Sequence, residues 1–289
     1  MKNTLALTAL AIAIAAPSTA LATDVKFGGV VQTKLNVIVP EGSDINVASG
    51  DVRLNANASE TVGGLTGFVN VQLNMDTLNS AKDGDDPEDP LDLDDTDGFS
   101  TDGVHAGISG DFGTFKMGKV DDVNFGRYGN DIEGEGIGNG AALGYTNSFG
   151  AVNFGAFYSP AGNSDEIALG ASTSFGPVNV GASFSSTDAT DKVLFGAEAG
   201  LGAVTVGAHL YTEETGAAEK EVAAVKVSGS AAAWSWGLTY AMNKDVQDHI
   251  RLDLGSSVAG LDLGIRYDSV SPEAGGSEDT AYIQLGKGF

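Results

Sequence analysis

The sequence predicts an all-β fold, a transmembrane antiparallel β-barrel of about sixteen strands. Three observations lead to this fold class. Apolar and polar residues alternate with a period of two along most of the chain. Glycine makes up 41 of 289 residues, and the helical apolar period is missing after residue 22. Short glycine-containing turns separate the alternating runs, which is typical of antiparallel hairpins.

The beginning of the chain has the pattern of an export signal. Lys2 precedes an apolar run at residues 5–16, and small residues follow up to Ala22. We therefore expect residues 1–22 to be a signal peptide and residues 23–289 to form the barrel. The chain has no cysteine, so an exported domain must be held without disulfides. A closed barrel meets this demand because every strand has two hydrogen-bonded neighbours.

The two parities of the alternating runs differ in chemistry. One parity is apolar and includes Phe27, Val31, Leu35, Leu261, Leu263 and Ile265. The other is polar or charged in mid-strand and includes Lys26, Gln32, Lys34, Asp262, Gly264 and Arg266. A soluble sandwich or small barrel would also alternate, with its apolar face inward. Aromatic residues near strand ends favour a membrane barrel with interfacial girdles; these are Tyr158, Tyr211, Tyr240, Tyr267 and Phe289.

Turns and loops set the number of strands. Seven tight turns are expected near residues 59–64, 110–113, 148–151, 174–177, 200–203, 229–232 and 258–260. Eight longer polar loops are expected near 39–46, 76–102, 121–139, 159–165, 186–191, 212–219, 243–247 and 270–278. Their alternation joins about sixteen strands, an even number with both chain ends on the short-turn side. At this size the interior is a water-filled channel and not a packed core.

The formal charge of −24 argues against nucleic acid as a partner, because phosphate binding needs clustered Lys and Arg. Residues 83–97 could offer carboxylates to Ca²⁺, but their spacing does not match a helix-flanked calcium loop. His105, His209 and His249 share the polar parity, and nothing in the sequence pairs them with a nucleophile. We therefore expect no enzyme activity, no catalytic residue, no dedicated metal site and no cofactor.

At this point the chain resembles the Gram-negative general diffusion porins. The resemblance rests on the opening strand at residues 24–30, the hairpin at residues 103–119 and the terminal Phe289. It covers essentially all of residues 23–289. It implies a bacterial outer-membrane barrel of sixteen strands, a homotrimer, and a third long loop folded into the pore. It also implies that Phe289 acts as an assembly signal.

The expected pore constriction has an acidic and a basic side. If the third loop folds inward as in similar porins, its carboxylates form the acidic side: Asp121, Asp122, Asp131, Glu133 and Glu135. The opposite wall would then be basic, and parity puts four residues inside the barrel that could form it: Lys26, Lys34, Arg53 and Lys116. A transverse field between such rows sorts solutes by charge and dipole. The alternative for the loop is a solvated acidic segment outside the pore.

Together these expectations predict a transport function that involves no chemical reaction. Surrounded by outer-membrane lipid, the barrel would let small hydrophilic solutes and ions diffuse passively, with a weak preference for cations. A solute-selective porin remains an alternative, since a few lumen side chains would decide specificity. A non-channel barrel, such as an adhesin or structural protein, would need a filled interior. Inward glycines such as Gly170, Gly181 and Gly264 speak against that filling.

Overall fold

The computed structural model describes residues 24–38, 47–76, 99–120, 123–129, 137, 140–160, 165–273 and 275–289. Within these ranges the regular structure is sixteen β-strands. No helix in the described part of the chain is long and apolar enough to cross a membrane. The strands are β1 (Asp24–Ile38), β2 (Val47–Val62), β3 (Leu65–Asp76), β4 (Phe99–Gly110), β5 (Gly113–Val120), β6 (Gly140–Phe149), β7 (Val152–Ser159), β8 (Glu166–Phe175), β9 (Val178–Ser186), β10 (Thr190–Leu201), β11 (Val204–Thr215), β12 (Ala218–Ala231), β13 (Trp234–Asn243), β14 (Gln247–Val258), β15 (Leu261–Pro272) and β16 (Glu278–Gly288).

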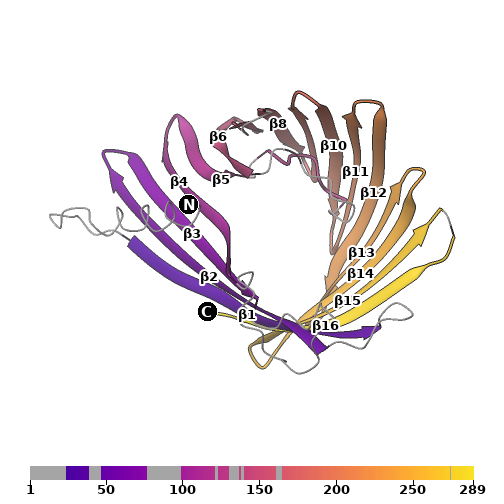
Figure 1. Ribbon diagram of the computed structural model, residues 1–289. Coiled ribbons are helices and arrows are strands. Elements are labelled where there is room, and N and C mark those ends of the chain that lie inside the picture. Colours follow the sequence, from indigo (N-terminus) through magenta and orange to yellow (C-terminus); the bar gives the residue numbers. More distant parts are fainter. Residues whose placement is uncertain are drawn as a thin grey trace, which may run out of the picture.

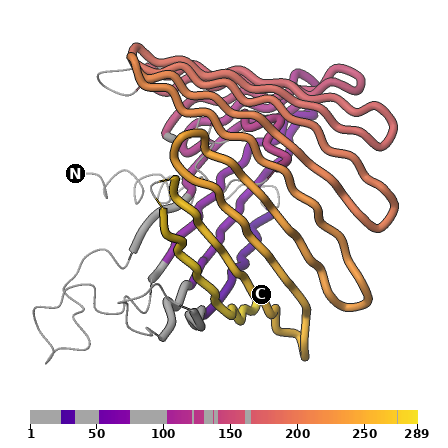
Figure 2. The backbone as a smooth tube through the Cα atoms, turned by 90° about the vertical axis from the view of Figure 1, so that its right-hand side faces the viewer, coloured from indigo at the N-terminus to yellow at the C-terminus, as the bar shows by residue number. Residues whose placement is uncertain are grey.

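The strands form one closed antiparallel barrel. Each strand pairs with its neighbours in the sequence, and β1 also pairs with β16 (Figure 1). The last residue takes part in this closure, because Gly29 and Phe289 exchange two backbone N–H···O bonds of 3.0 Å. In the side view the strands are tilted relative to the barrel axis (Figure 2), as closure of a barrel requires. The predicted fold class and strand number are confirmed.

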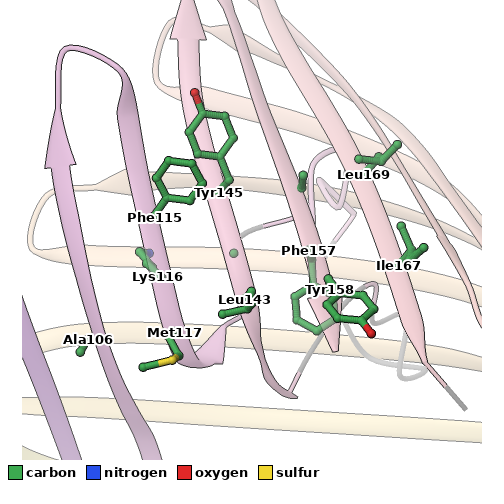
Figure 3. A pocket seen from close by; sticks show the side chains of 12 residues that line it. Ala106, Phe115, Lys116, Met117, Leu143, Tyr145, Phe157, Tyr158, Ile167 and Leu169 are labelled. Atoms are coloured by element: carbon green, nitrogen blue, oxygen red, sulfur yellow. The ribbon is translucent and has the colours of Figure 1, made fainter. Parts of the chain in front are cut away.

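One parity of the strands faces outward, and most of its side chains are apolar. Phe27 is 79% exposed, Leu169 55% and Leu210 60%. Between β4 and β8 this surface contains a shallow apolar hollow, in which Phe115 and Tyr145 pack ring against ring with centroids 4.5 Å apart (Figure 3). Exposed apolar side chains on this scale fit a surface covered by lipid hydrocarbon.

Most of the expected girdle aromatics lie on this outward parity, but Tyr211 does not. Tyr158, Tyr240 and Phe289 are exposed, whereas Tyr211 is only 1% exposed. Tyr211 shares its parity with the inward residue His209, and its hydroxyl donates to Glu213 Oε2 at 2.6 Å. Lys220 Nζ lies 5.7 Å from the centre of its ring. The prediction for Tyr211 was wrong, because Tyr211 stands on the inward parity of β11. A position near a strand end does not by itself put an aromatic ring on the outward face.

The tight turns occur where the sequence predicted them, with one shift. The hairpin between β12 and β13 turns at residues 232–233, later than the predicted 229–232. Ala232 takes a positive φ of 53° there, a conformation that glycine adopts at the equivalent Gly202. Three of the predicted long loops are short, since β9 to β14 continue through residues that the sequence assigned to loops. Their connections are residues 187–189, 216–217 and 244–246.

Candidate functional site

The segment that follows β5 lies inside the barrel, against its inner wall (Figure 1). Val120, Val123 and Ile137 are at most 1% exposed, so this part of the third long loop is packed and not solvated. Ile137 N–H donates to Asn124 Oδ1 at 2.8 Å, which ties the two sides of the loop together. The described residues of the loop therefore fold inward, as the resemblance implied.

Glycines on four adjacent strands form the floor beneath this segment. Gly170 on β8 faces Phe125, and Gly181 on β9 faces Gly126. A Cβ atom added at Gly181 would lie 2.7 Å from the Gly126 nitrogen. Gly196 on β10 and Gly207 on β11 lie directly beneath the carbonyl oxygens of Gly126 and Tyr128, respectively. Side chains at these positions would collide with the loop backbone, so the wall is built from the one residue that permits this approach.

Gly126 itself has a φ of +97°. This left-handed conformation lets the loop backbone turn while it stays in contact with the wall. Tyr128 N–H donates to Gly126 O at 3.0 Å, and Phe125 N–H donates to Val123 O at 2.9 Å. The loop is thus a series of tight turns that run across the strands.

Polar groups of the wall satisfy the loop backbone. The Ser183 hydroxyl lies within hydrogen-bonding distance of Val123 O, and 2.9 Å from Phe125 O. Gly129 N–H donates to His209 Nδ1 at 2.9 Å. Because Nδ1 accepts this bond, the proton of the neutral imidazole belongs on Nε2. Without these partners the buried loop amide and carbonyl groups would lack the hydrogen bonds that burial demands.

Among the described residues of this segment, Tyr128 has a perturbed acidity. Burial, and secondly the negative charge of Glu198, raise the pKa of the Tyr128 phenol above its usual value. The phenol therefore stays protonated at neutral pH. Glu198 lies on the inward parity of β10, where Asn179 Nδ2 donates to Glu198 Oε1 at 3.2 Å.

The predicted acidic side of the constriction lies outside the described residues. This applies to Asp121, Asp122, Asp131, Glu133 and Glu135. The described residues on both sides of the last three, Gly129 and Ile137, are held at the inner wall and in the buried part of the loop. Residues 83–97, the candidate calcium-binding segment, also lie outside the described part. Among the described residues no three His, Asp or Glu side chains gather as a metal ion would require.

The predicted basic residues occupy different levels of the barrel. Lys26 lies near the start of β1, where Nζ pairs with Asp24 at 3.1 Å and both side chains are well exposed. Arg53 pairs in register with Val30, four residues further along β1, or roughly 13 Å away. Lys116 lies on the inward parity of β5 between Gly107 and Gly144. The backbone of Lys34 pairs with Gln284 of β16.

A second group of charges lies on β14 and β15. Asp268 Oδ1 accepts from Arg251 Nε at 2.6 Å and lies 2.9 Å from His249 Nε2. Two rungs along the same strand pair, Arg266 Nε donates to Asp253 Oδ1 at 2.6 Å. Parity predicted the inward position of His249 and Arg266, but it did not predict the pairing of these charges. Cross-strand register supplies that information, because Arg251 lies opposite Asp268 and Asp253 opposite Arg266.

Comparison with known proteins agrees with this architecture. The family model for the Gram-negative porins matches residues 6–286. The chain belongs to this family. The porin family and the barrel fold indicate an outer-membrane channel protein. A search of the curated proteins found no match.

Solved structures show the same fold for this porin. A mutant of Rhodopseudomonas blastica porin is 15% identical with a TM-score of 0.71, and the match covers 92% of this chain and 100% of that one. A Salmonella typhi OmpF, solved in complex with daunomycin, is 13% identical with a TM-score of 0.72, covering 92% of this chain and 98% of that one. At such low identity the likeness carries the barrel and not the details of its interior.

Proposed function

We propose that this porin is a passive diffusion channel for small hydrophilic solutes and ions, weakly selective for cations. The observation that carries the proposal is the contrast between the two faces of the strands. Their outward parity is mostly apolar, whereas the inward parity of β14 and β15 carries paired charges, of which Arg266 and Asp253 are 34% and 33% exposed. Charges on an inner face are inexpensive only where water remains. A hydrated lumen is therefore the simplest environment for this wall.

The position of the third loop supports a narrowed but open channel. Its described residues pack against the glycines of β8 to β11, so this part of the loop narrows the channel from one side. A barrel with a structural or adhesive role would need an interior filled from both sides. The Arg266–Asp253 pair on β14 and β15 argues against such filling, because its side chains are 34% and 33% exposed and removing them from water would cost more than their attraction returns.

Cation preference is proposed from the charge of the third loop. Asp131, Glu133 and Glu135 lie between Gly129 and Ile137, the two residues held by the wall and the loop. We place these three carboxylates, with Asp121 and Asp122, at the constriction, and Lys26, Lys34, Arg53 and Lys116 along the facing wall. The three carboxylates would be the main local source of a cation preference. Screening limits this preference at physiological salt, where the Debye length is about 8 Å.

Assembly is proposed from the family resemblance. We expect an exported homotrimer in the outer membrane, with Phe289 as part of the assembly signal. In the described structure the Phe289 ring lies over Gly29 on the outward face, where it is 68% exposed. Deleting Phe289 should lower the amount of folded protein in the outer membrane, and unchanged levels would argue against this role.

Planar bilayer recording tests the channel function directly. Purified protein should give discrete conductance steps and a cation-selective zero-current potential that grows as salt is lowered. The combined change Asp131→Asn, Glu133→Gln and Glu135→Gln should move that potential towards anion preference. Absence of conductance would contradict the channel itself. An unmoved potential with normal conductance would contradict only the placement of the three carboxylates.

A further inference from the structure

A polar hollow of about 270 Å³ lies on the inner wall where the first and last strands meet. Its side chains come from four strands and are Gln32, Asp253, Asp262, Arg266, Tyr282 and Gln284. Gly264 and Gly286 leave its floor open. The hollow is separate from the glycine floor of the third loop, which lies on β8 to β11.

The polar groups of this hollow are held in place by one another. Arg266 Nε donates to Asp253 Oδ1 at 2.6 Å, and Gln284 Nε2 donates to Gln32 Oε1 at 2.6 Å. The guanidinium carbon of Arg266 lies 5.6 Å from the centre of the Tyr282 ring. A solute that binds here meets a surface whose side chains already have fixed positions, so little ordering is required on binding.

The chemistry of the lining favours a neutral, hydroxyl-rich solute. Carboxylates accept, a guanidinium donates, and each amide does both, which matches hydroxyl groups that act as donor and acceptor. Tyr282 adds an aromatic surface for the carbon-bound hydrogens of a sugar ring. The lining contains one guanidinium and two carboxylates, and the guanidinium is already paired with Asp253. An anionic solute would therefore find no uncompensated positive charge.

We propose that this hollow is a binding subsite for a neutral sugar unit on its way through the channel. The proposal rests on the proposed channel function and adds a solute class to it. The volume is slightly below the range of about 300–1,000 Å³ that is usual for ligand pockets. It therefore suits a single sugar ring and weak, rapidly reversible binding, which a channel needs for transport.

Two matched glycines allow a clean test. A Cβ atom at Gly264 would meet only the Gln284 Cβ, at 3.7 Å, so Gly264→Thr fills the hollow without a backbone clash. Gly103, on the inward parity of β4, has the same environment, with the Gln72 Cβ at 3.7 Å. Gly103→Thr therefore adds the same bulk elsewhere on the wall. Tyr282→Leu is a second variant, which removes the aromatic ring and keeps the strand residue apolar.

The experiment is a titration of single-channel current with D-glucose, using folded protein in planar bilayers. The wild type and Gly103→Thr should show a saturable decrease of current with the same half-saturation concentration. Gly264→Thr and Tyr282→Leu should raise that concentration roughly tenfold or more. A decrease that is only linear, as for polyethylene glycol of similar size, would overturn the subsite. A current that saturates with the free amino acid glycine in solution, but not with glucose, would overturn the solute class. Absence of any conductance would instead refute the proposed channel function.

Discussion

The wall formed by β8 to β11 and the wall formed by β14 to β16 both present alternate residues to the inside, yet their side chains differ. The first carries Gly170, Gly181, Gly196 and Gly207 beneath the third loop. The second carries ion pairs such as Arg266 with Asp253, whose side chains are 34% and 33% exposed. Backbone packed on backbone leaves no room for side chains, whereas a wall that faces water can keep long charged ones. Inward positions thus carry glycine where the loop backbone packs against them, and charged side chains where they face water.

In both walls the opposite parity faces outward and is mostly apolar. Leu210→Lys on β11 and Leu252→Lys on β14 each place a charge on this outward parity. Each should lower the free energy of unfolding by about 2 to 4 kcal/mol, the cost near the bilayer midplane. Folding into lipid vesicles at increasing urea concentrations measures this. Gln72→Lys, on the inward parity of β3, is the control and should be tolerated. Equal tolerance of all three would show that the faces are assigned wrongly.

The glycine floor predicts a large effect that is confined to one wall. A side chain in Gly196→Val would collide with the Gly126 and Ala208 carbonyl oxygens. We expect a loss of about 3 kcal/mol in stability, at the upper end of overpacking costs. We also expect an increased single-channel conductance, because the third loop would lose its contact with the inner wall. Gly103→Val, at an open inward position, should change both quantities little. Similar behaviour of the two variants would remove the distinction between the walls.

The ion pairs predict a smaller effect on the other wall. Asp268→Asn leaves Arg251 without its charged partner, and both side chains are only about 15% exposed or less. The expected loss is about 2 kcal/mol, because a poorly solvated donor loses a charge-assisted bond. Asp24→Asn removes the exposed pair with Lys26 and should cost less than about 0.5 kcal/mol. Chemical denaturation in detergent compares the two, and equal losses would contradict the difference in burial.

The period of two was sufficient to predict strands and the inward position of Arg266, and the succession of tight turns and longer loops predicted sixteen of them. Each strand carries its own period of two, so no long-range information is needed. The inward glycines were also visible, but they were interpreted only as evidence for an open lumen. Their second role depends on register, which places Gly181 opposite Gly196 and brings the loop across them. The role of His209 as acceptor for Gly129 N–H likewise depends on a contact between residues 80 positions apart.

The absence of native cysteine makes one measurement especially direct. Tyr128→Cys places a single thiol on the described part of the third loop, and Leu252→Cys places one on the outward face. A methanethiosulfonate carrying a trimethylammonium group is then added during single-channel recording. If the third loop lies inside a water-filled channel, the Tyr128→Cys current should fall in a discrete step, whereas the Leu252→Cys current should not change. An unchanged current after confirmed modification of Tyr128→Cys would contradict this account of the channel.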